Sequence, residues 1–538
     1  MVTCWCVCHT ARMITNTTAL EHLDEQALRR LAQQLLSTVS VQSAALAERE
    51  RVLTERDQLL KQKDLKIALL TQEISVYRRW RFDKRSEAYK GVQRSLFDED
   101  IDADLAAMQA ELKALLPKTD KPAAPKDQPR RTALPAQLPR TEFHHEPETT
   151  MCGCGCALKR IGEDVSEKLD YTPGVFTVQR HIRGKWACAA CQTLTQAPVP
   201  PHIIDKGIPT PGLLSHVLVA KYLDHLPLYR QERIFGRAGL EVPRSTLADW
   251  VGVCGVQLQP LVDALHKCLL QLPVLHADET PVQMLKPGSG KTHRAFIWTY
   301  ASGRFEDLKA VIYQFHDSRS GTHAQEFLQD WQGSLVCDDY GGYKALSAKG
   351  VTEVGCMAHA RRYFFDLYQA SASDVAEQAL VLFKSLYEIE ELAKDLDAQA
   401  RWRMRQTRSK PIAEKFHAWM ISQRLLATDG TRLARALDYS LKRWTALVRF
   451  LDDGRLPIDN NRAESLIRPI AMGRSNWLFA GSLRAGKRAA AVMSLIQSAK
   501  LNGHDPYVYL KDILTRLPTH PNSKIEELLP HNWIAPPI

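Results

Sequence analysis

The chain lacks any long uninterrupted hydrophobic run. No stretch of its 538 residues approaches the roughly 18 apolar residues that a membrane-spanning helix requires. The first twelve residues, MVTCWCVCHTAR, also lack the charged start and apolar core of a secretory signal peptide. We therefore expect a cytoplasmic protein without membrane contact. Residues 1–19 match no recognisable pattern, so Met13 is an alternative start to Met1.

A strong excess of charge of one sign is also missing. The chain has 71 Lys and Arg against 61 Asp and Glu, a net charge of +10, with 45% hydrophobic and 25% charged residues. These fractions exclude a mostly disordered or collagen-like chain and are typical of a globular protein. At about 150 residues per domain, the length indicates three or four domains. The mild basic excess permits a nucleic-acid partner but does not require one.

Cysteines are few and clustered. Of twelve in the chain, five lie between positions 152 and 191, as a repeated C-x-C followed, after a strand-like stretch, by a C-x2-C hook. Two such hooks can close a tetrahedral zinc site that stabilises a segment too small to bury a core. We predict a zinc-ribbon-like, DNA-binding domain over 149–202. The expected ligands are Cys152, Cys154, Cys188 and Cys191, with Cys156 as an alternate for either of the first two. The alternative is a degenerate finger whose thiols bind no metal.

Residues 21–90 contain neither Pro nor Gly, and apolar residues recur at every seventh position. This heptad position is occupied by Val39, Leu46, Leu53, Leu60, Ile67 and Ile74. The complementary heptad position is largely polar, so the apolar seam is only half built. We predict a long helix over 20–95 that pairs subunits as a coiled coil. The alternative is one amphipathic helix lying on its own protein.

Two further segments precede the central part of the chain. The proline-rich, charged composition around 117–147 predicts a linker, which we place at 96–148. Residues 203–270 read as helices, with a glycine turn at Gly239 and a short helix capped at Ser245 or Thr246. This outline is typical of a helix-turn-helix, in which Arg237 and Arg244 would face DNA. Any helical hairpin produces the same outline.

After Pro273 the apolar pattern changes from helical to extended. It predicts a first strand ending at Asp278, a three-strand meander, a helix, and a fourth strand over 334–337 that ends at Asp338. A right-handed crossover would place the fourth strand parallel to the first and bring both carboxylates to one sheet edge. A bound divalent cation would satisfy two such acids. Alternatively, each aspartate is only a turn residue.

A third carboxylate that could join them lies on a predicted helix. Asn460 and Asn461 precede Glu464 by four and three residues, so the three can share a face, with Arg468 one turn further along. An acid, amides and an arginine together suit metal ligation beside a phosphate. A capped surface helix with a salt bridge is the alternative.

Several long motifs occur together in one order and resemble those of transposases of the bacterial insertion sequence 66 family, from about residue 20 to the C-terminus. They are ADETP at 277–281, DDYGGY at 338–343, CMAHARR at 356–362, NNRAE at 460–464, GRSNWLFAGS at 473–482 and LNGHDPY at 501–507. The resemblance implies a multidomain α/β protein with a ribonuclease-H-like mixed sheet. The catalytic domain would span 271–500 with a helical insertion at about 370–448, followed by a C-terminal tail over 501–538.

The same resemblance implies a DDE transposase in which Asp278, Asp338 and Glu464 form the acidic triad. The triad would hold two Mg²⁺ ions, or Mn²⁺, about 4 Å apart for DNA strand cleavage and strand transfer. Asp339, where the family usually has a small residue, is a rival to Asp338. Cys356 and His359 match a family motif and read either as half a metal site or as packing behind the triad.

The implied partners are double-stranded DNA of the element ends and the target, a second copy of the chain, and small accessory proteins of the element. Candidates for phosphate contacts, besides Arg237 and Arg244, are Lys286, Lys291, Arg294, Arg468, Arg474, Lys487 and Arg488. Two alternative functions stay open. One is a catalytically inactive DNA-binding regulator derived from a transposase, and the other is a nuclease without strand transfer.

Overall fold

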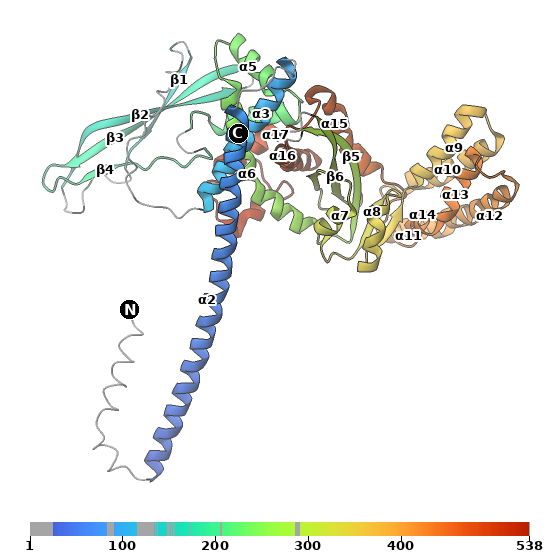
Figure 1. Cartoon of the computed structure of the whole chain (residues 1–538), viewed down its shortest axis with the longest axis horizontal. Coiled ribbons are helices and arrows are strands. Elements are labelled where there is room, and N and C mark those ends of the chain that lie inside the picture. Colours follow the sequence, from blue (N-terminus) through green and yellow to red (C-terminus); the bar gives the residue numbers. More distant parts are fainter. Residues whose placement is uncertain are drawn as a thin grey trace. The chain divides into compact units, whose positions relative to one another are not determined.

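The computed structural model describes residues 25–82, 91–115, 134, 136, 138–147, 151, 153, 156–172, 174–204, 207–285 and 291–536. The chain divides into two compact units, Met1–Glu73 and Ile74–Ile538, and the secondary structure mixes helices with two sheets (Figure 1). Among the described residues, no helix is long and apolar enough to cross a membrane.

The first described element is the long helix α2, Glu25–Phe82, which confirms the predicted N-terminal helix. Its heptad residues Val39, Leu46, Leu53 and Leu60 are each more than half exposed. Exposed apolar residues at this spacing form a stripe along one side of the helix. The predicted coiled-coil pairing stays a prediction.

The helix α3, Gly91–Leu115, replaces the first part of the predicted linker. It packs against α6, Arg244–Leu269, at a close crossing where a Cβ on Gly252 would lie 2.2 Å from the carbonyl oxygen of Ala103. Asp104 of α3 is fully buried and forms a 3.0 Å ion pair with Arg488. A segment held by a buried ion pair and a tight helix crossing is part of the core, so the linker prediction was wrong for 96–115.

A long hairpin follows, made of β2 (Leu158–Thr172) and β3 (Val175–Cys188), which pair antiparallel. The strand β1 (Arg140–His145) pairs parallel with β3, and β4 (Leu194–Gln196) pairs with its other end. The end of the linker prediction, 140–145, was therefore also wrong. Leu169, Phe176 and Val178 join the main hydrophobic core, so the base of the hairpin is anchored in the helical domain.

That helical domain consists of α4 (Pro211–Tyr222), α5 (Leu228–Arg237) and α6. Gly239 forms the predicted turn with a φ of +79°, a conformation that glycine adopts without strain. The following helix is not short: α6 has 26 residues, begins after Pro243 without a side-chain cap, and buries its first turns. The prediction of a short helix capped by Ser245 or Thr246 was wrong, because α6 is a central core helix.

The central sheet has the strand order β7-β6-β5-β8-β9. Its strands are β5 (Val274–Leu285), β6 (Thr292–Ser302), β7 (Val311–His316), β8 (Ser334–Cys337) and β9 (Thr352–Gly355). The meander β5-β6-β7 is antiparallel, and β8 pairs parallel with β5, which confirms the predicted crossover through α7 (Gly321–Leu328). The fifth strand, β9, pairs parallel with β8 and was not predicted.

One edge of this sheet is covered by a C-terminal helix. The helix α16 (Leu483–Leu501) contacts β7, and the hydroxyls of Ser494 and Ser498 accept hydrogen bonds from the backbone N–H groups of Tyr313 (2.8 Å) and Val311 (3.0 Å). In the sequence, α15 (Asn461–Trp477) precedes α16, and α17 (Pro506–Arg516) and a 3-10 turn at Asn522–Leu528 follow it.

The last residues are not a tail. The side chains that α17 and the following segment bury in the main core are Tyr509, Leu510, Ile513, Leu514, Leu528, Leu529 and Trp533. This contact with the core corrects the prediction for 501–538.

A helical module lies between β9 and α15 and has its own core, built around Phe364, Phe383, Phe416 and Phe450 (Figure 1). Its main helices are α9 (Met357–Ser371), α10 (Asp374–Ala393), α11 (Ala398–Met404), α12 (Lys410–Leu426), α13 (Arg432–Lys442) and α14 (Trp444–Leu447). The short helix α8 (Gly341–Lys344) and a 3-10 helix at Ala345–Lys349 precede β9. A π-helix at Arg405–Ser409 and a 3-10 helix at Arg449–Leu451 lie within the module. The helices begin at Met357, earlier than the predicted 370.

Candidate active site

Two of the three predicted acids, Asp278 and Asp338, lie at matching positions just beyond the paired part of two adjacent strands of the central sheet. The parallel pairing of β5 with β8 stops at His276 and Val336, and Asp278 and Asp338 each lie two residues beyond that pair. Asp278 was predicted to end the first strand. It lies instead inside β5, where it pairs with Thr299 of β6. The side of β5 that faces β8 is unpaired at Asp278 because β8 ends at Cys337, whereas β5 itself continues to Leu285.

Asp278 sits in a strongly unfavourable environment for a negative charge. Burial, as the largest cause, and the charges of Glu279, Asp338 and Glu464 together raise the pKa of its carboxyl to about 8, against one hydrogen bond from the Glu279 N–H. The charges of Asp338 and Glu464 therefore act on Asp278, although the ligand atoms of these three described acids do not form a group within 4.8 Å of one another. Crowded carboxylates are stabilised by a divalent cation, and oxygen ligands are those that Mg²⁺ prefers. A set of oxygen donors suits a divalent cation, and Mg²⁺ is the ion that the family resemblance implies.

Asp338 and its neighbour Asp339 have different surroundings. The Asp338 carboxylate accepts a 3.0 Å hydrogen bond from the N–H of Tyr340. Asp339 instead forms ion pairs with Arg443 and with Lys344, the latter at 3.1 Å. An acid neutralised by two cations is a poor ligand for a metal ion, which favours Asp338 over Asp339 for that role.

The start of α15 is attached directly to β5. The Asn460 side chain hydrogen-bonds Nδ1 of His276 and donates to the Ala277 carbonyl, both at 2.8 Å. His276 is fully buried, and burial lowers its pKa to about 4, so the ring is neutral. This clasp holds α15 next to Asp278 and thereby positions Glu464. Sequence reasoning did not assign His276 a role; a lone histidine in the apolar strand VLHADE was the available signal.

The other predicted asparagine points elsewhere. The Asn461 backbone and side chain both donate to the carboxylate of Asp459, at 3.1 and 2.7 Å. That carboxylate also accepts from the hydroxyl of Tyr387 at 3.0 Å, so this pair stabilises the helix start.

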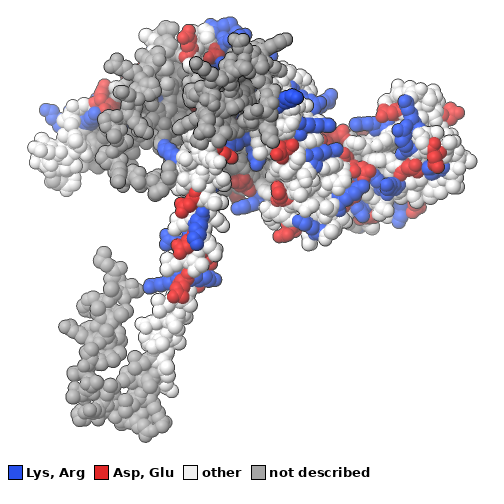
Figure 2. All heavy atoms as spheres, in the orientation of Figure 1, with Lys and Arg blue, Asp and Glu red and all other residues white. Residues whose placement is uncertain are grey.

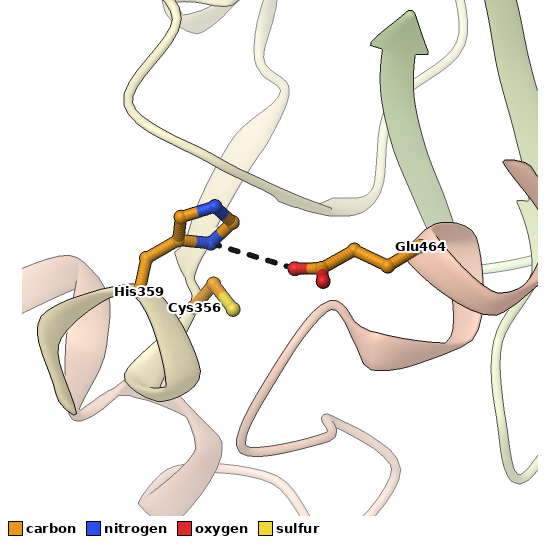
Figure 3. Close-up of side chains that lie close together, drawn as sticks. All are labelled: Cys356, His359 and Glu464. Carbon is orange, nitrogen blue, oxygen red and sulfur yellow. Dashed lines mark ion pairs between the residues drawn. The ribbon is translucent and has the colours of Figure 1, made fainter. Parts of the chain in front are cut away.

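Cys356, His359 and Glu464 form a compact cluster beside the acids (Figure 3). Nδ1 of His359 lies 3.7 Å from Oε1 of Glu464, and Arg362 approaches the other carboxylate oxygen at 3.8 Å. Sγ of Cys356 accepts a 3.2 Å hydrogen bond from the N–H of Asn460, which ties the start of α9 to the start of α15. Burial raises the pKa of Cys356 to about 12.

Glu279 is an acid that the prediction left without a role. Its side chain is 1% exposed and accepts hydrogen bonds from Arg319 (2.8 Å to Nε) and from the Tyr343 hydroxyl (2.7 Å). These contacts identify Glu279 as a neutralised structural acid that also contributes to the electrostatic field at Asp278.

The predicted DNA-contacting residues are spread over the surface of the chain. Those that are exposed are Arg237, Lys291, Arg294, Arg468, Arg474 and Lys487, while Arg244 is half-buried and Lys286 lies outside the described residues. Arg488 is buried against Asp104, so the prediction of a phosphate contact was wrong for this residue. Figure 2 shows Lys and Arg side chains mixed with Asp and Glu on the face that it draws, with no field of a single sign.

A groove of about 810 Å³ lies beside the start of α15, between α9 and α10. Basic and aromatic side chains line it together, including Arg361, Arg362, Lys384 and the partly exposed Phe365. Asn461 forms part of its wall, so the groove borders the site. Sequence reasoning did not single out these residues.

The described cysteines of the hairpin lie at one of its ends. Cys188 ends β3 opposite Leu158, Cys156 lies two residues before the start of β2, and the N–H of Cys191 donates to Sγ of Cys188 at 3.5 Å. Cys152 and Cys154 lie outside the described residues. Thiol donors from both hooks thus belong to the same end of the hairpin, a donor set that suits zinc.

Comparison with known families shows a consistent match along the chain. The model of the transposase IS66 family matches residues 206–488, and the IS66 C-terminal element matches 494–531. The zinc-finger binding domain of transposase IS66 matches 149–192, and a model described as transposase C of IS166 homeodomain matches 69–142.

Three similar proteins come from Sinorhizobium fredii and are named as uncharacterized proteins. The protein y4qI is 38% identical over 490 residues, which covers 87% of this chain and 89% of y4qI. The protein y4jD is 36% identical (75% of this chain, 82% of y4jD), and y4hP is 35% identical (75% and 77%).

Proposed function

The chain belongs to the IS66 family of transposases, and on that premise we propose that it cuts DNA at the ends of an insertion sequence and joins the freed ends to target DNA. The observation that carries the proposal is geometric: Asp278 and Asp338 lie at matching positions beyond the pairing of β5 with β8, and Asn460 attaches the start of α15, the helix of Glu464, to β5. A ribonuclease-H-like core is supported by the sheet order, with three antiparallel strands followed by two parallel ones.

Asp278, Asp338 and Glu464 would hold divalent metal ions with their carboxylates, and the clasp of Asn460 on β5 would keep Glu464 in reach of the other two. Bound magnesium would supply stabilisation of the negative charge on the oxygens that enter and leave the phosphate. Asp339 and Glu279 would stay outside this set, because basic residues already neutralise them.

DNA would be held by exposed basic residues of the proposed catalytic domain, of which Arg468 and Arg474 lie on the same helix as Glu464. Arg294, Arg468 and Arg474 are exposed, and Arg474 lies on α15 within hydrogen-bond distance (3.1 Å) of the Pro281 carbonyl of β5. The groove between α9 and α10 adds Arg361 and Arg362. Such contacts bind phosphates without reading the sequence.

The other parts of the chain would prepare the DNA for cutting. The zinc finger, through Cys188, Cys191 and two of Cys152, Cys154 and Cys156, would take part in recognition of the element ends. The exposed apolar stripe of α2 would pair two copies, which would bring two ends together.

The direct test is a magnesium-dependent cleavage and joining assay with the full chain and a labelled duplex that carries a terminal repeat of its own element. Asp278→Asn, Asp338→Asn and Glu464→Gln should each abolish cleavage and joining while binding of the duplex is retained. Asp339→Asn is the matched control and should retain cleavage.

Three results would contradict parts of the proposal. Cleavage by Asp338→Asn but not by Asp339→Asn would transfer the catalytic role to Asp339. Binding without any cleavage by the wild type would indicate an inactive regulator. Cleavage without joined product would indicate a nuclease.

A further inference from the structure

Beside the carboxylate site lies a second, chemically different group of metal-binding atoms. One ligand atom each from Cys356, His359 and Glu464 lies within 4.8 Å of the other two, and Figure 3 shows the thiol and the imidazole facing the carboxylate. Tetrahedral zinc, with bonds of about 2.0–2.3 Å, separates its ligand atoms by about 3.3–3.8 Å. The 3.7 Å between His359 Nδ1 and Glu464 Oε1 already has that spacing.

Two of the three ligand atoms have unmet bonding capacity. His359 Nδ1 and Glu464 Oε1 are both buried, and neither has a hydrogen-bond partner among the described residues. Burying a polar atom without a partner costs free energy, so such a pair in a folded protein calls for an explanation, and a missing ion is one of the recognised explanations.

The backbone holds these donors in place before any ion arrives. Cys356 is the N-cap of α9 and His359 lies three residues further, so both side chains emerge from the same first turn. The Asn460 N–H that donates to Cys356 Sγ belongs to the residue that caps α15, the helix that carries Glu464. The two helix starts are thus fixed to each other, and the ligands with them.

We propose that Cys356, His359 and Glu464 bind a transition-metal cation of the zinc class, at a site that lies outside the zinc finger and overlaps the magnesium triad only at Glu464. Sulfur and imidazole donors select zinc-like ions over magnesium, which prefers oxygen donors only. Three protein ligands leave one position open for water or a fourth ligand.

The site shares Glu464 with the magnesium triad, so its occupation has a consequence that rests on the proposed function. A zinc ion bound to Cys356 and His359 holds the Glu464 carboxylate on the side of α9 and withdraws it from Asp278 and Asp338. Zinc-class ions therefore act as inhibitors of the magnesium-dependent reaction.

The binding test uses elemental analysis of the full chain after equilibration with zinc, and cobalt substitution to observe the sulfur-to-cobalt charge-transfer absorption. Cys356→Ser and His359→Asn should each bind one metal equivalent less than wild type and should lose the corresponding part of the cobalt spectrum. The zinc finger contributes equally to all samples and cancels in the difference spectrum. Cys268→Ser, which changes a half-buried thiol of α6 outside the cluster, is the matched control and should behave as wild type.

Equal metal content and equal cobalt spectra in wild type, Cys356→Ser and His359→Asn would overturn the proposal. Circular dichroism and thermal unfolding establish that the variants are folded. Asp278→Asn should keep the extra equivalent, because Asp278 is not a ligand of this site; its loss there would also contradict the proposal. These readouts need no DNA cleavage, so they stand or fall independently of the proposed transposase activity.

Discussion

Two clusters of buried charge in this chain are built in opposite ways. In the helical module, Arg405 is fully buried, forms a two-bond ion pair with Glu390 (2.8 and 2.6 Å) and donates to the carbonyls of Phe450, Asp453 and Leu456. At the edge of the central sheet, Asp278 is surrounded by three other acids and receives one backbone hydrogen bond.

The comparison separates a charge whose partners all lie within the fold from acids that lack neutralising partners and could bind a ligand. Every hydrogen bond of Arg405 runs to an acceptor of the same module, so its interactions are complete without a ligand. Burial and the charges of the neighbouring acids disfavour ionisation of Asp278, and a bound cation would relieve this. Under the proposed function, unbalanced charge marks the site more clearly than burial alone does.

The largest expected effect comes from removing the charge of Arg405, whose cluster in the helical module is electrostatically balanced. Arg405→Met should lower the free energy of unfolding by about 3–5 kcal/mol, because Glu390 and the three carbonyls lose their buried partner. Denaturant unfolding measures the change, and Arg403→Met, an exposed neighbour, is the control. A loss below about 1 kcal/mol would show that the Arg405 cluster is not what holds the module.

A smaller effect is expected when a cation neutralises the acids at the edge of the central sheet. Magnesium at about one hundred times its dissociation constant should stabilise the wild-type protein by about 2.7 kcal/mol. Asp338→Asn should lose most of this gain, whereas Asp339→Asn should keep it, because Asp339 is already paired with Arg443. Thermal unfolding with and without magnesium measures the difference. Equal stabilisation of both variants would place the cation elsewhere.

The pH dependence of the metal-free protein sharpens the comparison further. The folded pKa of Asp278, about 8, lies above the unfolded value of about 3.9, so the folded state binds more protons between these limits. The stability contributed by this group is present below about pH 4 and is lost as the pH rises through about 8, by at most about 1.4 kcal/mol per pH unit. Asp278→Asn removes this slope. Free energies of unfolding that depend on pH identically in the two proteins, measured in the presence of a chelator, would refute this contribution of Asp278.

The smallest expected effect concerns exposed charges, which belong to neither cluster. Arg361→Ala, in the groove between α9 and α10, should weaken DNA binding and reduce the salt dependence of the binding constant by about one ion. Arg403→Ala, equally exposed but outside the groove, is the control. Fluorescence anisotropy at several salt concentrations measures both. Identical slopes for the two variants would remove the groove from the DNA path.

The parts of the fold that depend on local pattern were predictable from the sequence. The unbroken polar helix of α2 and the meander with its parallel fourth strand follow from periodicity and from the handedness of crossovers. The cysteine spacing likewise indicated the zinc finger that the family comparison supports.

The errors arose where a distant partner decides the structure. The first strand was predicted to end at Asp278, yet β5 continues through Pro281 to Leu285. Proline has no N–H group, and at this position the group would face the side of β5 on which the pairing with β8 stops at His276. Pairing on that side resumes only at Met284, which pairs with Ala480. The linker prediction included α3 wrongly, because Arg488, the residue that pairs with Asp104 in the core, lies far away in the sequence.

The serines of α16 have a consequence for how copies of this protein meet. An open outer strand offers a row of backbone groups to which another molecule can add a strand of its own, which is how sheets grow into aggregates. On β7, Ser494 and Ser498 engage the N–H groups of Tyr313 and Val311, and Ser498 also donates to the Val311 carbonyl at 3.0 Å. The sheet is thereby closed on this side by hydroxyl groups, and two copies cannot join through β7 while α16 is in place.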